Sequence, residues 1–225
     1  NILAGYYAKR MGLPIRKLVC ASNSNNVLTE FFASGEYDKN REFFKTVSPS
    51  MDILISSNLE RLLFEVSGRN PEITAKRMEE LKTKGKYSVS DREKAILSAE
   101  FYADYTDEEE CFETISAFFD EYGYVLDPHT AVAVNVSDGY LSYTASDKPL
   151  VVLSTASPYK FGQTVLKAIT GEKTSDAFIA AEKISNESAT VIPNQITALK
   201  TKPRRFSASV KPEDAKSEVI AFVEK

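Results

Sequence analysis

Apolar residues recur every three or four positions along most of this chain, and that spacing predicts helices. In the first helix Leu3, Tyr7 and Met11 share one face. Asn1 precedes this helix as its N-cap, and Gly12 ends it. Further helices are predicted over residues 27–33, 52–66, 71–84, 90–102, 107–121, 128–136, 158–169, 175–184 and 212–223.

Continuous apolar runs interrupt the helical pattern and predict strands. These runs cover residues 15–21 and 149–154, with a shorter strand-like run over 205–210. The order of elements predicts an α/β fold with a helical insertion. Residues 1–22 and 124–172 belong to the α/β domain in this interpretation, 23–123 form a mainly helical insertion, and 173–225 form a C-terminal segment.

The second strand ends in the most informative part of the chain. It delivers the hydroxyls of Ser154 and Thr155 to a turn. Pro158 then starts a helix that carries Lys160 in its first turn, where a cation opposes the helix dipole unless it binds an anion. α/β proteins usually hold polar ligands at such strand–turn–helix junctions.

Composition narrows the classes of partner. The 225 residues carry a net charge of -4 and are 43% hydrophobic, which argues against a nucleic-acid partner and allows a sizeable core. No apolar run approaches the ~20 residues that span a bilayer, and no leader pattern opens the sequence. Cys20 and Cys111 have no metal-binding or redox spacing, so we expect a buried, reduced pair. A cytoplasmic protein without membrane contact is the default expectation.

The residues alone identify no reaction. His129 is the single histidine, so a hydrolase triad or a histidine-based zinc site would depend on it alone. Its place after Pro128 favours capping or packing over ligand contact. No glycine-rich phosphate loop lies within the chain. An interaction module with an acidic helical block therefore stays open beside an enzyme.

Several segments together resemble the threonine synthase family. The resemblance rests on residues 1–14, 21–26, 48–53, 57–62, 127–133 and 154–161, in that order. It implies a pyridoxal-phosphate (PLP) domain of fold type II, the tryptophan synthase β-like kind, N-terminally truncated by a third or more. The implied reaction converts O-phospho-L-homoserine and water to L-threonine and phosphate.

The resemblance also assigns roles to particular residues. Thr155 would face the pyridine nitrogen of PLP, where a neutral hydroxyl leaves the ring a milder electron sink than a carboxylate would. Asn1 resembles the last residue of the family's Gly-Asn-Phe-Gly-Asn loop, which binds the cofactor phosphate. Lys160 and Asn26 would contact the substrate. For each, an ordinary capping, turn or surface role is the alternative, and no metal is expected.

One part of the family pattern is missing. No lysine here lies in the family's Ser-Phe-Lys-Asp setting, so the Schiff-base lysine is absent and we expect no catalysis by this chain alone. A catalytically dead threonine synthase-like protein and another fold-type II lyase, such as a serine or threonine dehydratase, remain as alternatives. The pattern leaves open the oligomeric state and the roles of Asn23, Asn25, Ser57 and Asn58.

Overall fold

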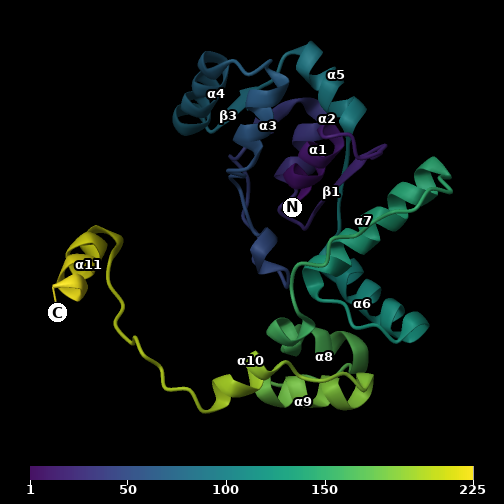
Figure 1. The fold of residues 1–225 in the computed structure, drawn as a ribbon, viewed down its shortest axis with the longest axis vertical. Coiled ribbons are helices and arrows are strands. Elements are labelled where there is room, and N and C mark those ends of the chain that lie inside the picture. Colours follow the sequence, from purple (N-terminus) through teal and green to yellow (C-terminus); the bar gives the residue numbers. More distant parts are fainter. Residues whose placement is uncertain (225) are drawn as a thin grey trace. The chain divides into compact units, whose positions relative to one another are not determined.

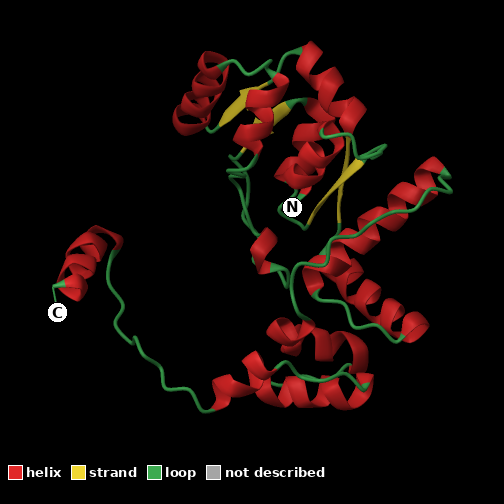
Figure 2. Ribbon diagram, in the orientation of Figure 1, coloured by secondary structure: helices red, strands yellow, loops and turns green. Residues whose placement is uncertain are grey.

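Contacts within the chain define two compact units. The computed structural model describes residues 1–224; the first unit is Asn1–Ile192 and the second begins at Pro193 (Figures 1 and 2). The first contains α1 (Ile2–Arg10), β1 (Leu18–Ser22), α2 (Val27–Ser34), β2 (Glu36–Asp38), η1 (Pro49–Met51), α3 (Leu59–Val66), α4 (Pro71–Lys84), β3 (Lys86–Ser88), α5 (Asp91–Glu100), β4 (Phe101–Tyr105), α6 (Glu108–Tyr122), α7 (Pro128–Thr144), η2 (Pro158–Phe161), α8 (Gly162–Thr170) and α9 (Ala177–Ser188). The second contains α10 (Asn194–Thr197), η3 (Ala198–Lys200), η4 (Pro212–Asp214) and α11 (Ala215–Val223).

Two small sheets form within the described residues. β1 and β4 pair in parallel, with Leu18 opposite Phe101, and β2 and β3 pair antiparallel, with Tyr37 opposite Tyr87. The connection from β1 to β4 runs through α2, α3, α4 and α5, so the predicted insertion contains strands as well as helices (Figure 1).

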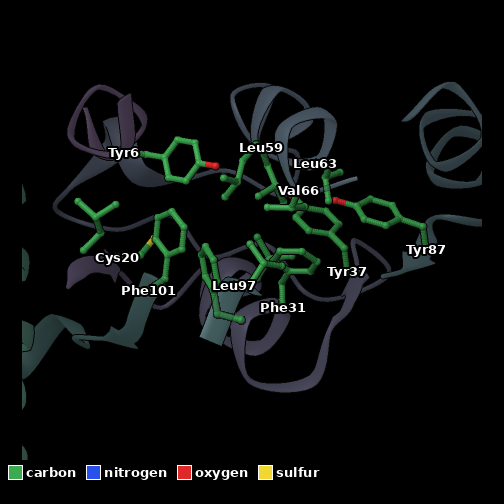
Figure 3. Close-up of a cluster of buried hydrophobic side chains, with 14 of the residues drawn as sticks. Tyr6, Cys20, Phe31, Tyr37, Leu59, Leu63, Val66, Tyr87, Leu97 and Phe101 are labelled. Carbon is green, nitrogen blue, oxygen red and sulfur yellow. The ribbon is translucent and has the colours of Figure 1, made fainter. Parts of the chain in front are cut away.

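Aromatic rings fill the core around these sheets (Figure 3). Tyr37 and Tyr87 stack with their ring centroids 5.3 Å apart, and Phe101 stacks on Phe32 at 4.9 Å. Phe31 is fully buried beside the tyrosines. Burying such rings stabilises the fold by roughly 25 cal/mol per Å² of apolar surface removed from water.

A second core lies between α6 and α7. Cys111 and Ile115 pack there against Leu126, Ala131 and Val132.

Both cysteines, Cys20 and Cys111, are buried, as expected, and burial raises the pKa of each thiol to about 12. No helix within residues 1–224 is long and apolar enough to cross a membrane.

One buried ion pair joins α4 to α5. The guanidinium of Arg77 contacts both carboxylate oxygens of Glu93, at 2.8 and 2.5 Å. Glu93 Oε2 also accepts hydrogen bonds from the Ser90 backbone N–H (2.8 Å) and hydroxyl (2.7 Å). Burial by itself would raise the pKa of Glu93, but the hydrogen bonds from Arg77 and Ser90 outweigh it and lower the pKa to about 2.

Helices with capping residues at their starts begin close to the predicted residue, and those that a glycine terminates also end close to it. Ser90 and Asp107 each cap a helix through a complete capping box, and Asn70 caps the helix that Pro71 starts. Gly35 and Gly123 end α2 and α6 in the left-handed conformation. Asn1 occupies the predicted N-cap position, but its side chain makes no capping hydrogen bond.

The predicted strand over 149–154 is wrong. The segment has no regular secondary structure, with Val151 82% and Leu153 55% exposed. A continuous apolar run forms a strand only when neighbouring strands satisfy its backbone groups, and within residues 1–224 none pairs with it. The run over 205–210 is irregular for the same reason.

Other predicted boundaries are wrong locally. The helix expected over 52–66 begins only at Leu59, because the side chain of Asp52 is bonded into the preceding loop. The helix expected over 90–102 ends at Glu100, where β4 begins. The helix expected over 158–169 divides into the 3₁₀ turn η2 and the helix α8.

Replacing Gly85 with Ala tests the end of α4. Gly85 has a φ of +78°, and an added Cβ would collide with the side chain of Asn40, which donates to the Lys84 carbonyl at 3.1 Å. Gly171 ends α8 with a φ of +76° and has open space around it. We expect Gly171→Ala to cost about 1–2 kcal/mol from the backbone alone, and Gly85→Ala to cost about 1 kcal/mol more. Urea unfolding of both variants measures the difference, and equal costs would contradict it.

Candidate functional site

A buried polar cluster lies where β1 ends. The Asp52 carboxylate accepts hydrogen bonds from the side-chain amides of Asn23 (2.8 Å) and Asn25 (3.1 Å). It also accepts from the hydroxyl (2.7 Å) and backbone N–H (3.0 Å) of Thr46. Because both amides are used within the protein, Asn23 and Asn25 hold the loop of residues 44–52 against the end of the strand.

The predicted substrate contact Asn26 lies beside a cation that the sequence analysis missed. Its Oδ1 accepts a hydrogen bond from Arg41 Nη1 at 2.9 Å, and Arg41 also pairs with Glu30. Asn26 is half-buried at the N-cap of α2, and its side chain does not cap the helix. Arg41 follows β2 in an irregular segment, where hydrophobic periodicity carries no signal for it.

Asp127 organises the N-terminal end of α7. Its side chain is buried and accepts hydrogen bonds from the backbone N–H and Nδ1 of His129, both at 2.9 Å. It also accepts from the backbone N–H (3.4 Å) and the hydroxyl of Thr130. Burial raises the pKa of this carboxyl, but the hydrogen bonds from His129 and Thr130 together hold it below its ordinary value. Asp127 therefore stays ionised and accepts only.

His129 is used within the protein through both ring nitrogens. Nε2 lies 3.1 Å from the backbone N–H of Ser50, which can only donate, so Nε2 carries no proton. The proton then lies on Nδ1, where it is donated to Asp127. The ring also packs edge-on against Phe161, with centroids 4.6 Å apart. The ring of His129 therefore packs within the protein, as the sequence favours, whereas the cap of α7 is Asp127.

Ser154 and Thr155 are both exposed, and Ser154 is hydrogen-bonded to α7. Ser154 Oγ lies 3.1 Å from Thr130 Oγ1. The Thr130 hydroxyl is the donor in this contact, and it also donates to the Asp127 carboxylate. The Thr155 side chain makes no hydrogen bond to any residue within 1–224. Ser154 is thus held by a hydrogen bond, and the next residue, Thr155, carries a hydroxyl with no hydrogen-bond partner within residues 1–224.

Lys160 and Asn1 are both exposed. Lys160 lies in the turn η2 rather than in the first turn of an α-helix, and its backbone N–H donates to the Ser157 carbonyl at 3.0 Å. Its Nζ lies 5.8 Å from the centroid of the Phe161 ring. The Asn1 carbonyl accepts the N–H of Ala4 at 2.9 Å.

The structure brings some of the predicted residues together. Thr155 and Lys160 share one short segment beside the N-terminal end of α7. No hydrogen bond or ion pair described within residues 1–224 joins Asn1 or Asn26 to that segment. The sequence missed the central place of Asp127, although an Asp before a Pro-started helix is a recognisable capping signal.

Ser57 and Asn58, whose roles the sequence leaves open, lie at the surface. Ser57 is exposed, and Asn58 accepts a hydrogen bond from Arg61 at the start of α3. Asn58 occupies the N-cap position without capping through its side chain. Its contact with Arg61 lies within one helical turn, so it organises the start of α3 locally.

Comparison with known proteins places the chain in a family. Residues 130–223 match the family model "Threonine synthase, C-terminal". "Threonine synthase-like 1" of Homo sapiens is 42% identical over 173 residues, which are 75% of this chain and 22% of that protein. A crystal structure of threonine synthase from yeast superposes with a TM-score of 0.82 at 35% identity, covering 99% of this chain and 45% of the other.

A second similar structure is that of a PLP-bound enzyme. It is the PLP-bound threonine synthase from Brucella melitensis, which superposes with a TM-score of 0.70 at 37% identity. The match covers 84% of this chain and 44% of that one, so the chain spans less than half of the length of these relatives. The chain therefore belongs to the threonine synthase family, has the fold of the fold-type II PLP enzymes, and corresponds to the C-terminal portion of the family's members.

Proposed function

We propose that these residues supply the C-terminal part of a threonine synthase that converts O-phospho-L-homoserine and water to L-threonine and phosphate. The observation that carries the proposal is the pair formed by Ser154 and Thr155. Ser154 is hydrogen-bonded to α7, and the next residue exposes a hydroxyl that no residue within 1–224 uses. A fixed and available hydroxyl suits a polar atom of a bound ligand.

The donor set fits PLP in chemical terms. The Thr155 hydroxyl can donate to the pyridine nitrogen without charging it. Asn1 precedes α1, whose first backbone N–H groups have no partner within the helix and suit a phosphate. Bound PLP would supply an electron sink for elimination and replacement at the substrate carbons. In this proposal Thr155 orients the ring, and Asn1 lies at the phosphate.

Lys160 and Asn26 are the proposed substrate contacts. Lys160 is exposed and makes no ion pair within the described residues, so its amine can bind a phosphate. Asn26 accepts a hydrogen bond from Arg41, whose guanidinium also pairs with Glu30. The proposal also places the reaction in the cytoplasm, with a small-molecule substrate and no nucleic-acid or membrane partner.

The full-length protein that contains these residues provides the test. Incubation with PLP and O-phospho-L-homoserine should release inorganic phosphate and L-threonine in equal amounts. Release of ammonia from serine or threonine instead would indicate a dehydratase. A second candidate, a threonine synthase-like protein that binds PLP without turnover, is favoured by the similarity to threonine synthase-like 1. PLP binding with neither product would establish that candidate.

The chain alone should not attach PLP covalently. None of its lysines lies in the family's Ser-Phe-Lys-Asp setting, so we expect no PLP to remain after borohydride treatment and gel filtration of residues 1–225. The full-length protein treated in the same way is the control and should retain about one PLP per chain. Stoichiometric retention by residues 1–225 would contradict the absence of the reactive lysine.

A further inference from the structure

The segment that carries Thr155 and Lys160 depends on side-chain contacts for its position. Residues 151–157 have no regular secondary structure, so no ladder of backbone hydrogen bonds fixes them. Val152 packs against the core between α6 and α7, and Ser154 is bonded to Thr130. Val151, Leu153 and Thr155 are exposed. The backbone at Thr155 therefore follows wherever its few anchored neighbours are held.

Two arms connect this segment to a single carboxylate. In the first arm the Thr130 hydroxyl donates both to the Asp127 carboxylate and to Ser154 Oγ. In the second arm Asp127 accepts Nδ1–H of His129, whose ring packs against Phe161 at 4.6 Å. One arm thus reaches residue 154 and the other reaches residue 161.

We propose that Asp127 is a positioning residue that clamps residues 154–161 at both ends and so places the Thr155 hydroxyl and the Lys160 amine. The proposal rests on the proposed function for what that segment binds. Asp127 does not touch the ligand in this scheme and acts only through Thr130 and His129. Its burial suits the role, because a carboxylate away from water holds its hydrogen-bond donors more firmly.

The ring of His129 is also held through its other nitrogen, Nε2. The backbone N–H of Ser50 donates to Nε2 at 3.1 Å, so the ring is held between the loop at η1 and the carboxylate. With both nitrogens engaged, the imidazole plane is fixed, and so is the face it presents to Phe161. Lys160 in turn lies over the Phe161 ring, with its Nζ 5.8 Å from the centroid. The clamp therefore extends to the lysine.

Thr130→Val is the sharpest test, because it removes the hydroxyl while keeping the shape of the side chain and the capping of α7 by Asp127. In the full-length protein, hydrogen exchange of residues 154–161 should rise while that of residues 128–144 stays unchanged. The dissociation constant of PLP should rise about tenfold. Thr130→Ser keeps the hydroxyl and should restore both values.

Asp127→Ala removes both arms and should raise exchange at residue 161 as well as at residue 154. It also removes a helix cap, so Asp176→Ala is the matched control: Asp176 caps α9 through the N–H groups of Phe178 and Ile179. The control should leave exchange at 154–161 and PLP binding unchanged.

Each outcome decides between the two proposals. Unchanged exchange of residues 154–161 in both Thr130→Val and Asp127→Ala would overturn the clamp, whether or not PLP binds. Raised exchange with unchanged PLP affinity would overturn its role in placing Thr155. If the unaltered protein binds no PLP, the proposed function fails, and the exchange data still test the clamp.

Discussion

Replacing Glu93 with Ala is expected to lower the free energy of unfolding by about 3–5 kcal/mol, a large part of the stability of a domain. The change leaves the buried guanidinium of Arg77 without its two contacts at 2.8 and 2.5 Å. It also removes the acceptor for the Ser90 backbone N–H at the start of α5. An uncompensated buried charge costs more than the pair contributes when it is intact.

Chemical unfolding of the chain measures this effect against two controls. Glu80→Ala breaks the Glu80–Lys84 pair on α4, the helix of Arg77, where Lys84 is 66% exposed, and should cost less than about 1 kcal/mol. The double variant Arg77→Met/Glu93→Leu removes both charges and should recover much of the loss. A cost for Glu93→Ala no larger than for Glu80→Ala would contradict the prediction.

The same pair predicts a dependence on pH. The pKa of Glu93 is lowered from 4.5 to about 2, so its contribution is complete above pH 4.5 and is lost as the pH falls through 2. The stability difference between the unaltered chain and Glu93→Gln should therefore narrow between pH 4.5 and 2. Unfolding curves at several pH values across this range follow the difference, and a constant gap would contradict it.

Thr155→Val should reduce turnover of the full-length protein about five- to 150-fold while leaving its fold intact. The loss corresponds to about 1–3 kcal/mol, the cost of leaving a buried polar atom without its hydrogen-bond partner, here the ring nitrogen of PLP. The Thr155 hydroxyl makes no hydrogen bond to any residue within 1–224, so its removal breaks none there.

Steady-state kinetics measures the loss of turnover, and circular dichroism shows whether the fold is intact. Thr155→Ser keeps a hydroxyl and should retain most of the activity. Thr83→Val is a control of the same chemistry, since the Thr83 hydroxyl donates to the Glu79 carbonyl at 2.7 Å on an exposed face of α4. Unaltered kcat and PLP affinity in Thr155→Val would count against both the assigned role and the enzyme.

The sequence predicts best the helices whose ends carry capping residues. α5 and α6 follow from Ser90 and Asp107, because a side-chain cap is a local interaction that sequence spacing records. β2 and β3 escape prediction because each has three residues, and their pairing depends on the stacked Tyr37 and Tyr87 far apart in the chain. Strand pairing is a tertiary property.

The same difference between local and long-range interactions applies to the candidate site. Thr155 is singled out by the resemblance of residues 154–161 to threonine synthases, and Lys160 by its place in a Pro-started turn; the strand expected before Thr155 does not form. The network that holds them could not be predicted, because it joins Ser50, Asp127 and Ser154 across more than a hundred residues. The resemblance assigns Asn26 to the substrate, but the hydrogen bond that Asn26 accepts from Arg41 appears only in the folded chain.

The parallel pairing of β1 with β4 has a consequence for kinetics. Its register joins Leu18 to Phe101, so the whole intervening chain must be closed into a loop before a single rung of this ladder forms. The helices α2, α4 and α5 instead depend on contacts within and just beyond themselves and can appear early. We therefore expect β1, with the loop of residues 44–52 at its end, to pair late in folding, at a rate set by the long loop that must close rather than by the strength of its hydrogen bonds.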